Sequence, residues 1–179
     1  MRPVICLLRA VNVGGHNVVE MDRLRELFVS LRLQNPRTYV QSGNVVFETA
    51  VKDLRPLAGR IQEAIGREFG FQPEVILRTR EELRGAANAN PFAARGDVEP
   101  AKLLVVFLQG TPPAAAVRKV HEMKTDPEEV RIRGREVFIH YPQGMGRSKL
   151  AWTAIEKALG TAGTGRNWNS VMKLLEMAR

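Results

Sequence analysis

The sequence is poor in the residues that build disulfide frameworks and metal centres. It has one cysteine, Cys6, and three histidines that lie far apart in the chain. One thiol cannot form an internal disulfide, and no Cys or His pair shows the spacing of a structural zinc site. Cys6 lies inside the apolar run Val4–Leu8, which is typical of an inert core thiol. We therefore expect no metal site, and nothing in the sequence indicates a particular cofactor.

Long hydrophobic runs are also missing. An apolar run such as Leu103–Leu108 is far shorter than the roughly 20 residues that a membrane-spanning helix needs. Met1 to Val4 leads straight into an expected strand, without the apolar core of a signal peptide. Apolar residues at 44% and charged residues at 26% are close to globular averages. We expect a folded cytoplasmic protein without a membrane segment.

Acidic residues are the third deficit. The chain has 19 Asp and Glu against 27 Lys and Arg, which gives a formal net charge of +8. A basic balance favours anionic partners such as nucleic acid, nucleotides or acidic metabolites. Many of the arginines are scattered singly along expected helices, where long basic side chains usually cover a solvated face. The charge therefore suggests a class of partner without identifying one.

The first half of the chain has the periodicity of an α+β domain. Apolar residues at successive positions predict buried strands, and apolar residues at spacings of three and four predict amphipathic helices. Asp53 is an expected helix N-cap, Gly70 an expected helix end, and Thr79 to Glu82 an expected capping box. The expected order is a strand at 4–10, a helix at 21–31, a hairpin at 38–47, a helix at 54–65 and a strand at 73–77.

The second half repeats this order. After a linker at 88–101, the patterns predict a strand at 103–108, a helix after Thr111–Pro113, a hairpin at 130–139 and a helix at 150–158. The last element is expected to be a helix at 168–178, in place of a clear fourth strand. The fold class is α+β, with two tandem ferredoxin-like units and an extra C-terminal helix. The expected domains are 1–87 and 102–179.

Four separated motifs carry a family resemblance. They are Leu8–Gly15, Tyr39–Phe47, Gly146–Leu150 and Thr164–Val171. In this order they resemble the bacterial domain-of-unknown-function family 1697. Ala10 stands where glycine is commoner in that family, and Gly165 where threonine is commoner. The resemblance implies a pair of ferredoxin-like domains, and it brings no substrate, cofactor or catalytic residue.

Polar residues of these motifs are candidates for a binding site. They follow buried elements, and loops after buried elements commonly hold binding groups. Gly144–Lys149 and Thr164–Asn169 are expected to lead straight into helices, whose N-termini attract anions. The candidate ligand-binding residues are Arg9, Asn12, Gln41, Ser42, Asn44, Arg147, Ser148, Lys149, Arg166, Asn167 and Asn169.

Structural roles explain many of the same residues. Ser148 and Asn167 are good helix caps, and Gln41 and Asn44 can bond the backbone of their own hairpin. Arg147 and Arg166 are open to ligand binding, to ion pairing between domains or to solvent. Trp168 has the spacing of a packing residue rather than of a base-stacking one.

Motifs for catalysis are absent. The segment around Ser148 lacks the full phosphate-loop spacing, so nucleotide hydrolysis is unsupported. Ser148, His140 and Asp126 could form a triad on paper, but the sequence around Ser148 is not a nucleophile elbow.

We expect a module that binds a small anionic ligand at the junction of the two units, and a phosphate-bearing molecule is one candidate for that ligand. One alternative is a nucleic-acid-binding protein, although the RNP1 pattern of RNA-recognition motifs is missing. Another is an enzyme acting on an anionic substrate, in which Arg147, Lys149 and Arg166 would stabilise developing negative charge. The sequence leaves turnover, the identity of the ligand and the oligomeric state open.

Overall fold

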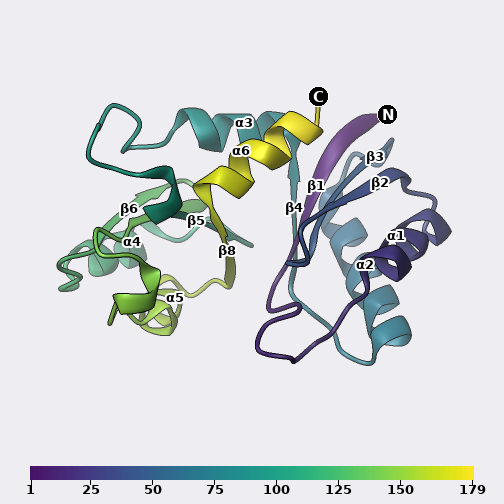
Figure 1. Ribbon diagram of the computed structural model, residues 1–179, viewed down its shortest axis with the longest axis horizontal. Helices are drawn as coiled ribbons and strands as arrows, with labels where there is room; N and C mark the ends of the chain where they lie inside the picture. Colours follow the sequence, from purple (N-terminus) through teal and green to yellow (C-terminus); the bar gives the residue numbers. More distant parts are fainter. The chain divides into compact units, whose positions relative to one another are not determined.

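The chain forms two compact units in the computed structural model, which describes residues 1–179. The first unit comprises Met1–Arg84 with Lys173–Arg179, and the second comprises Gly85–Met172. Both are mixed α and β, and each contains one four-stranded antiparallel sheet (Figure 1). None of the helices is long and apolar enough to cross a membrane.

The first sheet has the order β2-β3-β1-β4, so the first and third strands are central. In β1, five consecutive residues from Val4 to Leu8 are shielded from solvent. The elements of this part of the chain are β1 (Arg2–Leu8), α1 (Met21–Ser30), β2 (Gln34–Tyr39), β3 (Asn44–Thr49), α2 (Leu54–Phe69), β4 (Val75–Thr79) and α3 (Arg80–Asn88).

Helices α1 and α2 cover one face of this sheet (Figure 1). Phe28 of α1 packs edge-on against Phe47 of β3, with ring centroids 5.3 Å apart, at the centre of the apolar core. Both expected boundaries of α2 are confirmed. Asp53 accepts a hydrogen bond from the Arg55 amide, and Gly70 ends the helix with a φ of 80°.

The expected capping box begins α3. The Thr79 hydroxyl accepts a hydrogen bond from the Glu82 amide at 3.1 Å, and the Glu82 carboxylate accepts one from the Thr79 amide at 2.8 Å. Two amides at the start of the helix thereby find partners that the helix itself cannot supply.

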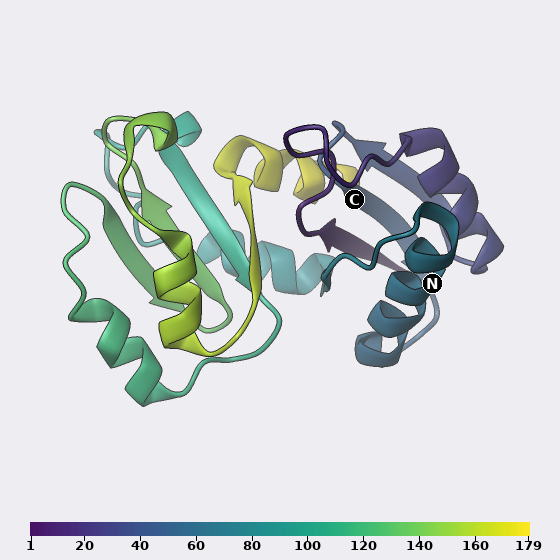
Figure 2. The ribbon, with the colours of Figure 1, turned by 90° about the horizontal axis from the view of Figure 1, so that it is seen from below.

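The second sheet has the order β6-β7-β5-β8, and all its pairs are antiparallel. Helices α4 and α5 lie together on one side of it, as the green and yellow-green helices of Figure 2 show. The elements are η1 (Pro100–Lys102), β5 (Leu103–Leu108), α4 (Ala114–His121), β6 (Glu129–Arg133), β7 (Glu136–His140), η2 (Met145–Arg147), α5 (Trp152–Leu159), β8 (Gly163–Asn167) and α6 (Trp168–Met177).

The expected helix at 168–178 forms as α6, but the expectation that no clear fourth strand precedes it was wrong. Gly163 to Asn167 form β8, which pairs with the buried strand β5 from Leu108↔Gly163 to Leu104↔Asn167. The sequence pattern does not predict this strand, because the strand contains two glycines and no apolar side chain. A Cβ on Gly163 would lie 2.8 Å from Val106 Cγ1, so the position is too close to β5 for any larger residue.

The two units repeat each other in register as well as in element order. Each has the order strand, helix, hairpin, helix, strand, and a helix follows the last strand at once, with the boundaries between the units falling inside these following helices. Arg78 of β4 pairs with Ile5 of β1, and Arg166 of β8 occupies the equivalent place against Val105 of β5. Both arginines are buried. The structural repeat therefore extends to a buried arginine next to the end of the fourth strand.

Candidate functional site

The eleven candidate residues divide between the two units. Five lie in the first, on the loop after β1 and around the β2–β3 turn: Arg9, Asn12, Gln41, Ser42 and Asn44. Six lie in the second, on the segment before α5 and around the end of β8: Arg147, Ser148, Lys149, Arg166, Asn167 and Asn169. Convergence of the two sets stays a prediction.

Asn12 joins the two loops of the first unit. Its amide Nδ2 donates to the carbonyl of Gln41 at 2.7 Å and to that of Val19 at 3.0 Å, while its Oδ1 accepts from the Val19 amide at 2.8 Å. Residues from two separated motifs are therefore brought together at one end of the first sheet. The Asn12 side chain is occupied in holding them there.

Asn44 has a similar structural role. It is fully buried, and its Nδ2 donates to the Ser42 hydroxyl at 2.8 Å and to the Tyr39 carbonyl at 3.2 Å. Arg9 is half-buried, and its backbone amide donates to the Glu74 carbonyl at 3.0 Å. These contacts support the interpretation that the amide groups of the first unit shape their own turn.

In the second unit, the expected helix start at Ser148 was wrong. Gly144, with a φ of 83°, ends a turn and is followed by the short 3-10 helix η2, whose last residue is Arg147. Ser148 accepts a hydrogen bond from the Leu150 amide at 3.0 Å, and α5 begins only at Trp152. Neither Arg147 nor Ser148 lies at the N-terminus of an α-helix, so the helix dipole does not support an anion site there.

Arg166 lies within β8 and not at a helix start. Its Nη1 donates to the Thr164 hydroxyl and the Gly165 carbonyl, both at 2.8 Å, and the residue is 7% exposed. Asn167 is the N-cap of α6, as expected, because its Oδ1 accepts from the Asn169 amide at 3.0 Å. Its Nδ2 donates to the Ala101 carbonyl at 2.9 Å. The contacts around Asn167 are those of a structural cap.

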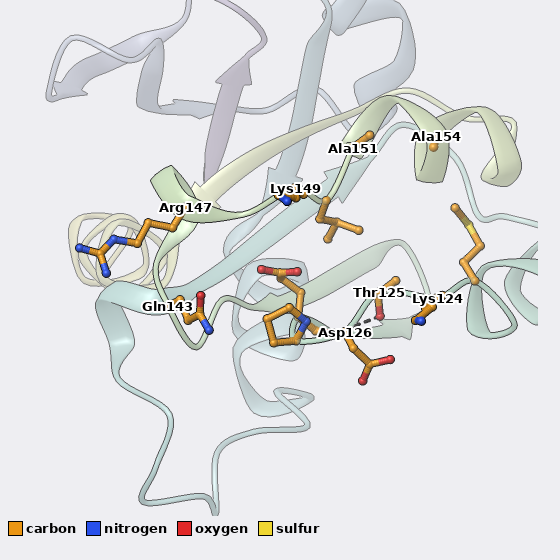
Figure 3. A pocket seen from close by; sticks show the side chains of 12 residues that line it. Lys124, Thr125, Asp126, Gln143, Arg147, Lys149, Ala151 and Ala154 are labelled. Atoms are coloured by element: carbon orange, nitrogen blue, oxygen red, sulfur yellow. Dashed lines mark hydrogen bonds between the residues drawn. The ribbon is translucent and has the colours of Figure 1, made fainter.

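A pocket of about 520 Å³ lies between the α4–β6 segment and the β7–α5 segment. Its volume is within the range of small-molecule sites. Figure 3 shows Gln143 and Arg147 on one side of it, Lys124 on the other, and Lys149 between them. The lining residues are Met123, Lys124, Thr125, Asp126, Pro127, Glu128, Gln143, Arg147, Lys149, Leu150, Ala151 and Ala154.

Local hydrogen bonds shape both walls. On one wall, the Glu128 amide donates to the Thr125 carbonyl at 2.9 Å and the Thr125 hydroxyl donates to the Glu128 carbonyl at 3.0 Å, which closes a tight turn. On the other wall, the bond from Leu150 to Ser148 holds the backbone on both sides of Lys149. Two of the predicted residues, Arg147 and Lys149, therefore line a defined pocket.

The rim of this pocket is basic. Lys124, Arg147 and Lys149 are exposed, and none of them forms an ion pair. The Arg147 side chain extends away from the centre of the pocket in Figure 3, so its guanidinium belongs to the outer rim. The carboxylates in the lining are those of Asp126 and Glu128, and the chain contains no group of three side chains that could hold a metal ion.

The triad considered on paper does not form around His140. His140 is 3% exposed, and its Nδ1 lies 3.3 Å from a carboxylate oxygen of Glu129. Arg95 donates to both oxygens of the same carboxylate at 2.8 Å and also pairs with Asp97. The hydrogen bonds from Arg95 lower the pKa of Asp97 to about 2. This ionic cluster fastens residues 95–97 to β6 and β7.

Sequence reasoning missed most of the lining, including two charged residues. Lys124 and Glu128 belong to the segment between α4 and β6, in which only Asp126 attracted attention. Thr125 and Glu128 have the spacing of a capping box, but no helix follows them. That spacing was the one sequence feature that could have drawn attention to Glu128, and it could not show that Glu128 is buried against a pocket.

The fold is shared with a bacterial protein of known structure. The conserved bacterial protein SP0830 from Streptococcus pneumoniae superimposes with a TM-score of 0.71, covering 99% of this chain and 98% of that one. The two sequences are 20% identical, which shows similarity of fold alone. No curated protein sequence matches this chain.

The sequence itself places the chain in a family. Residues 1–138 match DUF1697, a family of proteins of unknown function, and the chain belongs to that family. The resemblance carried by the motifs at Leu8–Gly15 and Tyr39–Phe47 is thereby confirmed. Arg147 and Lys149 lie beyond the matched residues, so the family match covers only Lys124 of the basic rim.

Proposed function

We propose that this protein binds a small ligand with an anionic oxygen group, such as a phosphate, in the pocket of its second unit. The observation that carries the proposal is the meeting of three unpaired cations, Lys124, Arg147 and Lys149, around a pocket of about 520 Å³. Unpaired basic groups at a concave site raise the local concentration of anions and donate charge-assisted hydrogen bonds to them.

We also infer that both units are ferredoxin-like. Each has the βαββαβ order and the 4-1-3-2 strand arrangement that this fold uses. An added helix follows the fourth strand in each case. The ligand site proposed here needs only the second of these units.

Nucleic-acid binding through a sheet face has less support. RNA-recognition motifs stack bases on aromatic side chains exposed on their central strands. The aromatic residues of the central strands here are Phe47, Phe107 and Phe138, and all three are fully buried. An exposed stacking platform is therefore missing from these strands.

A thermal-shift titration tests the proposal. Inorganic phosphate should raise the melting temperature in a concentration-dependent way, because a ligand of the native state stabilises by RT ln(1 + [L]/Kd). Lys149→Ala should weaken phosphate binding about fivefold or more, the effect of losing roughly one charge-assisted hydrogen bond. Arg147→Ala should have a smaller effect because its side chain lies on the outer rim.

Lys119→Ala is the matched control, since Lys119 is exposed on α4 and lines no part of the pocket. It removes the same charge from the same unit. Equal phosphate affinity in the wild type, Lys119→Ala and Lys149→Ala would show that any binding is non-specific and would overturn the proposal. An absence of any phosphate-dependent shift would overturn it as well.

A further inference from the structure

Glu128 is a buried carboxylate in the lining of the basic pocket. The residue is only 5% exposed, although glutamate is among the residues least often buried. Its backbone amide and carbonyl are both bonded to Thr125, which holds the backbone of this residue in place. No Lys, Arg or His forms an ion pair with its carboxylate, and no protein group donates a hydrogen bond to it.

A carboxylate in this position favours a partner that is positively charged or that donates a hydrogen bond. The Glu128 oxygens keep some contact with solvent, but the residue is 5% exposed, and partial desolvation of an ionised group without such a partner is costly. The negative charge of Glu128 affects the ionisation of a nearby tyrosine. The pKa of Tyr141 is raised, first by burial of the phenol and second by the nearby negative charge of Glu128.

The pocket therefore has two electrostatic poles. Glu128 supplies a buried acceptor, and Lys124, Arg147 and Lys149 supply exposed donors on the same pocket. A simple anion would satisfy the rim and would be repelled by Glu128. A simple cation would satisfy Glu128 and would be repelled by the rim. A ligand with both charges can satisfy the two poles at once.

We propose that the pocket binds a zwitterionic small molecule, with a protonated amine at Glu128 and a phosphate or carboxylate at the basic rim. The inference rests on the proposed anion site and adds a second, cationic group to the ligand. Glu128 has the role of a specificity residue, since it distinguishes amine-bearing ligands from plain anions of similar size. The known volume, about 520 Å³, suits a small metabolite of this kind.

Calorimetric titrations with four compounds at constant ionic strength test this inference. The probes are inorganic phosphate, ethyl phosphate, O-phosphoethanolamine and ethanolamine. Ethyl phosphate and O-phosphoethanolamine share the anionic group and differ in the amine. The wild type should bind O-phosphoethanolamine at least about tenfold more tightly than ethyl phosphate, the effect of one buried charge-assisted hydrogen bond.

Substitutions test whether Glu128 causes the preference for the amine-bearing ligand. Glu128→Gln keeps the shape of the side chain and removes its charge, so it should bring the affinities of O-phosphoethanolamine and ethyl phosphate close together. Lys149→Ala should weaken both compounds by a similar factor and keep the preference for the amine. Glu63→Gln, an exposed position on α2 in the first unit, should change neither affinity nor preference.

The outcomes separate this inference from the anion site. The anion site would stand and the zwitterion would be overturned if ethyl phosphate and O-phosphoethanolamine both bound in a Lys149-dependent way with equal affinity. The same conclusion would follow if a preference for the amine persisted in Glu128→Gln. Glu128-dependent binding of ethanolamine without any binding of phosphates would overturn the anion site. Calcium binding that Glu128→Gln abolishes, with no response to the amine, would show a cation site and overturn the zwitterion.

Discussion

Ala10 has a backbone conformation that alanine rarely adopts. Its φ of 55° lies in the left-handed region, which costs an L-residue with a Cβ roughly 1 kcal/mol relative to glycine. We predict that Ala10→Gly stabilises the protein by about 0.5–1 kcal/mol, because relief of strain outweighs the added freedom of the unfolded chain. Chemical denaturation of the two proteins measures the difference.

Ala115→Gly is the control for this substitution. Ala115 is exposed within α4, where glycine should cost about 0.5–1 kcal/mol relative to alanine. Opposite signs for the two variants are expected. Destabilisation of both by the same amount would show that Ala10 is not strained in solution.

The influence of Glu128 on Tyr141 can be measured without any ligand. The chain has two tyrosines, so a Tyr39→Phe background leaves Tyr141 as the only phenol to titrate. In that background, Glu128→Gln should lower the pKa of Tyr141, since the negative charge that disfavours the phenolate is removed. Absorbance at alkaline pH follows the phenolate. An unchanged pKa would place the carboxylate of Glu128 away from Tyr141 and weaken the account of the pocket.

The amide side chains show why site residues are hard to identify from sequence. Asn12, Asn44 and Asn167 are polar residues in family-like motifs, which made them candidates for ligand contacts. The structure uses each of them to hold a turn or cap a helix. A capping amide and a binding amide have the same chemistry, so only their partners in space can separate the two roles.

Among the elements of the fold, β8 can pack closely against β5 because Gly163 has no side chain. A Cβ on Gly163 would lie 2.8 Å from Val106 Cγ1 and 3.1 Å from the backbone oxygen of Phe107. Because the backbone oxygen cannot give way as a side chain can, Gly163→Ala should destabilise the protein by about 1–3 kcal/mol. Gly59→Ala, on α2 with no atom within 4 Å of the added Cβ, should stabilise it by about 0.5–1 kcal/mol.

Thermal and chemical denaturation of the two alanine variants compare them directly. A Gly163→Ala protein as stable as the wild type would show that β8 shifts freely along β5, contrary to the register described here. Loss of stability in Gly59→Ala would show that the substitution itself, rather than the contact with β5, causes the effect.

Periodicity predicts the elements that have an apolar face and fails for those that lack one. The strands around Val4, Val45 and Leu103 and the helix at Leu54–Phe69 were evident because burial imposes a pattern on them. The strand Gly163–Asn167 has no such pattern, since backbone pairing and close approach to β5 hold it in place. The start of α5 was misplaced by a few residues because Ser148 bonds within its own turn.

For the whole molecule, the repeat of element order was predicted and the repeat of register was not. The equivalence of Arg78 and Arg166 follows from their partners Ile5 and Val105, and pairing between strands cannot be read from residue identity. Arg147 and Lys149 were predicted as binding residues, and both line the pocket. Glu128, which lines the same pocket, could not be predicted, because its burial depends on how two segments that are separate in the sequence approach each other.

The measurement that tests the central claim most directly is amide chemical-shift mapping of inorganic phosphate on the isotope-labelled protein. The account predicts saturable shifts concentrated at Thr125–Glu128 and Arg147–Leu150, the two walls of the pocket. The same shifts should require higher phosphate in Lys149→Ala. Shifts confined to the Asn12 and Gln41 loops, or a response spread evenly over the basic surface, would contradict a ligand site in the second unit.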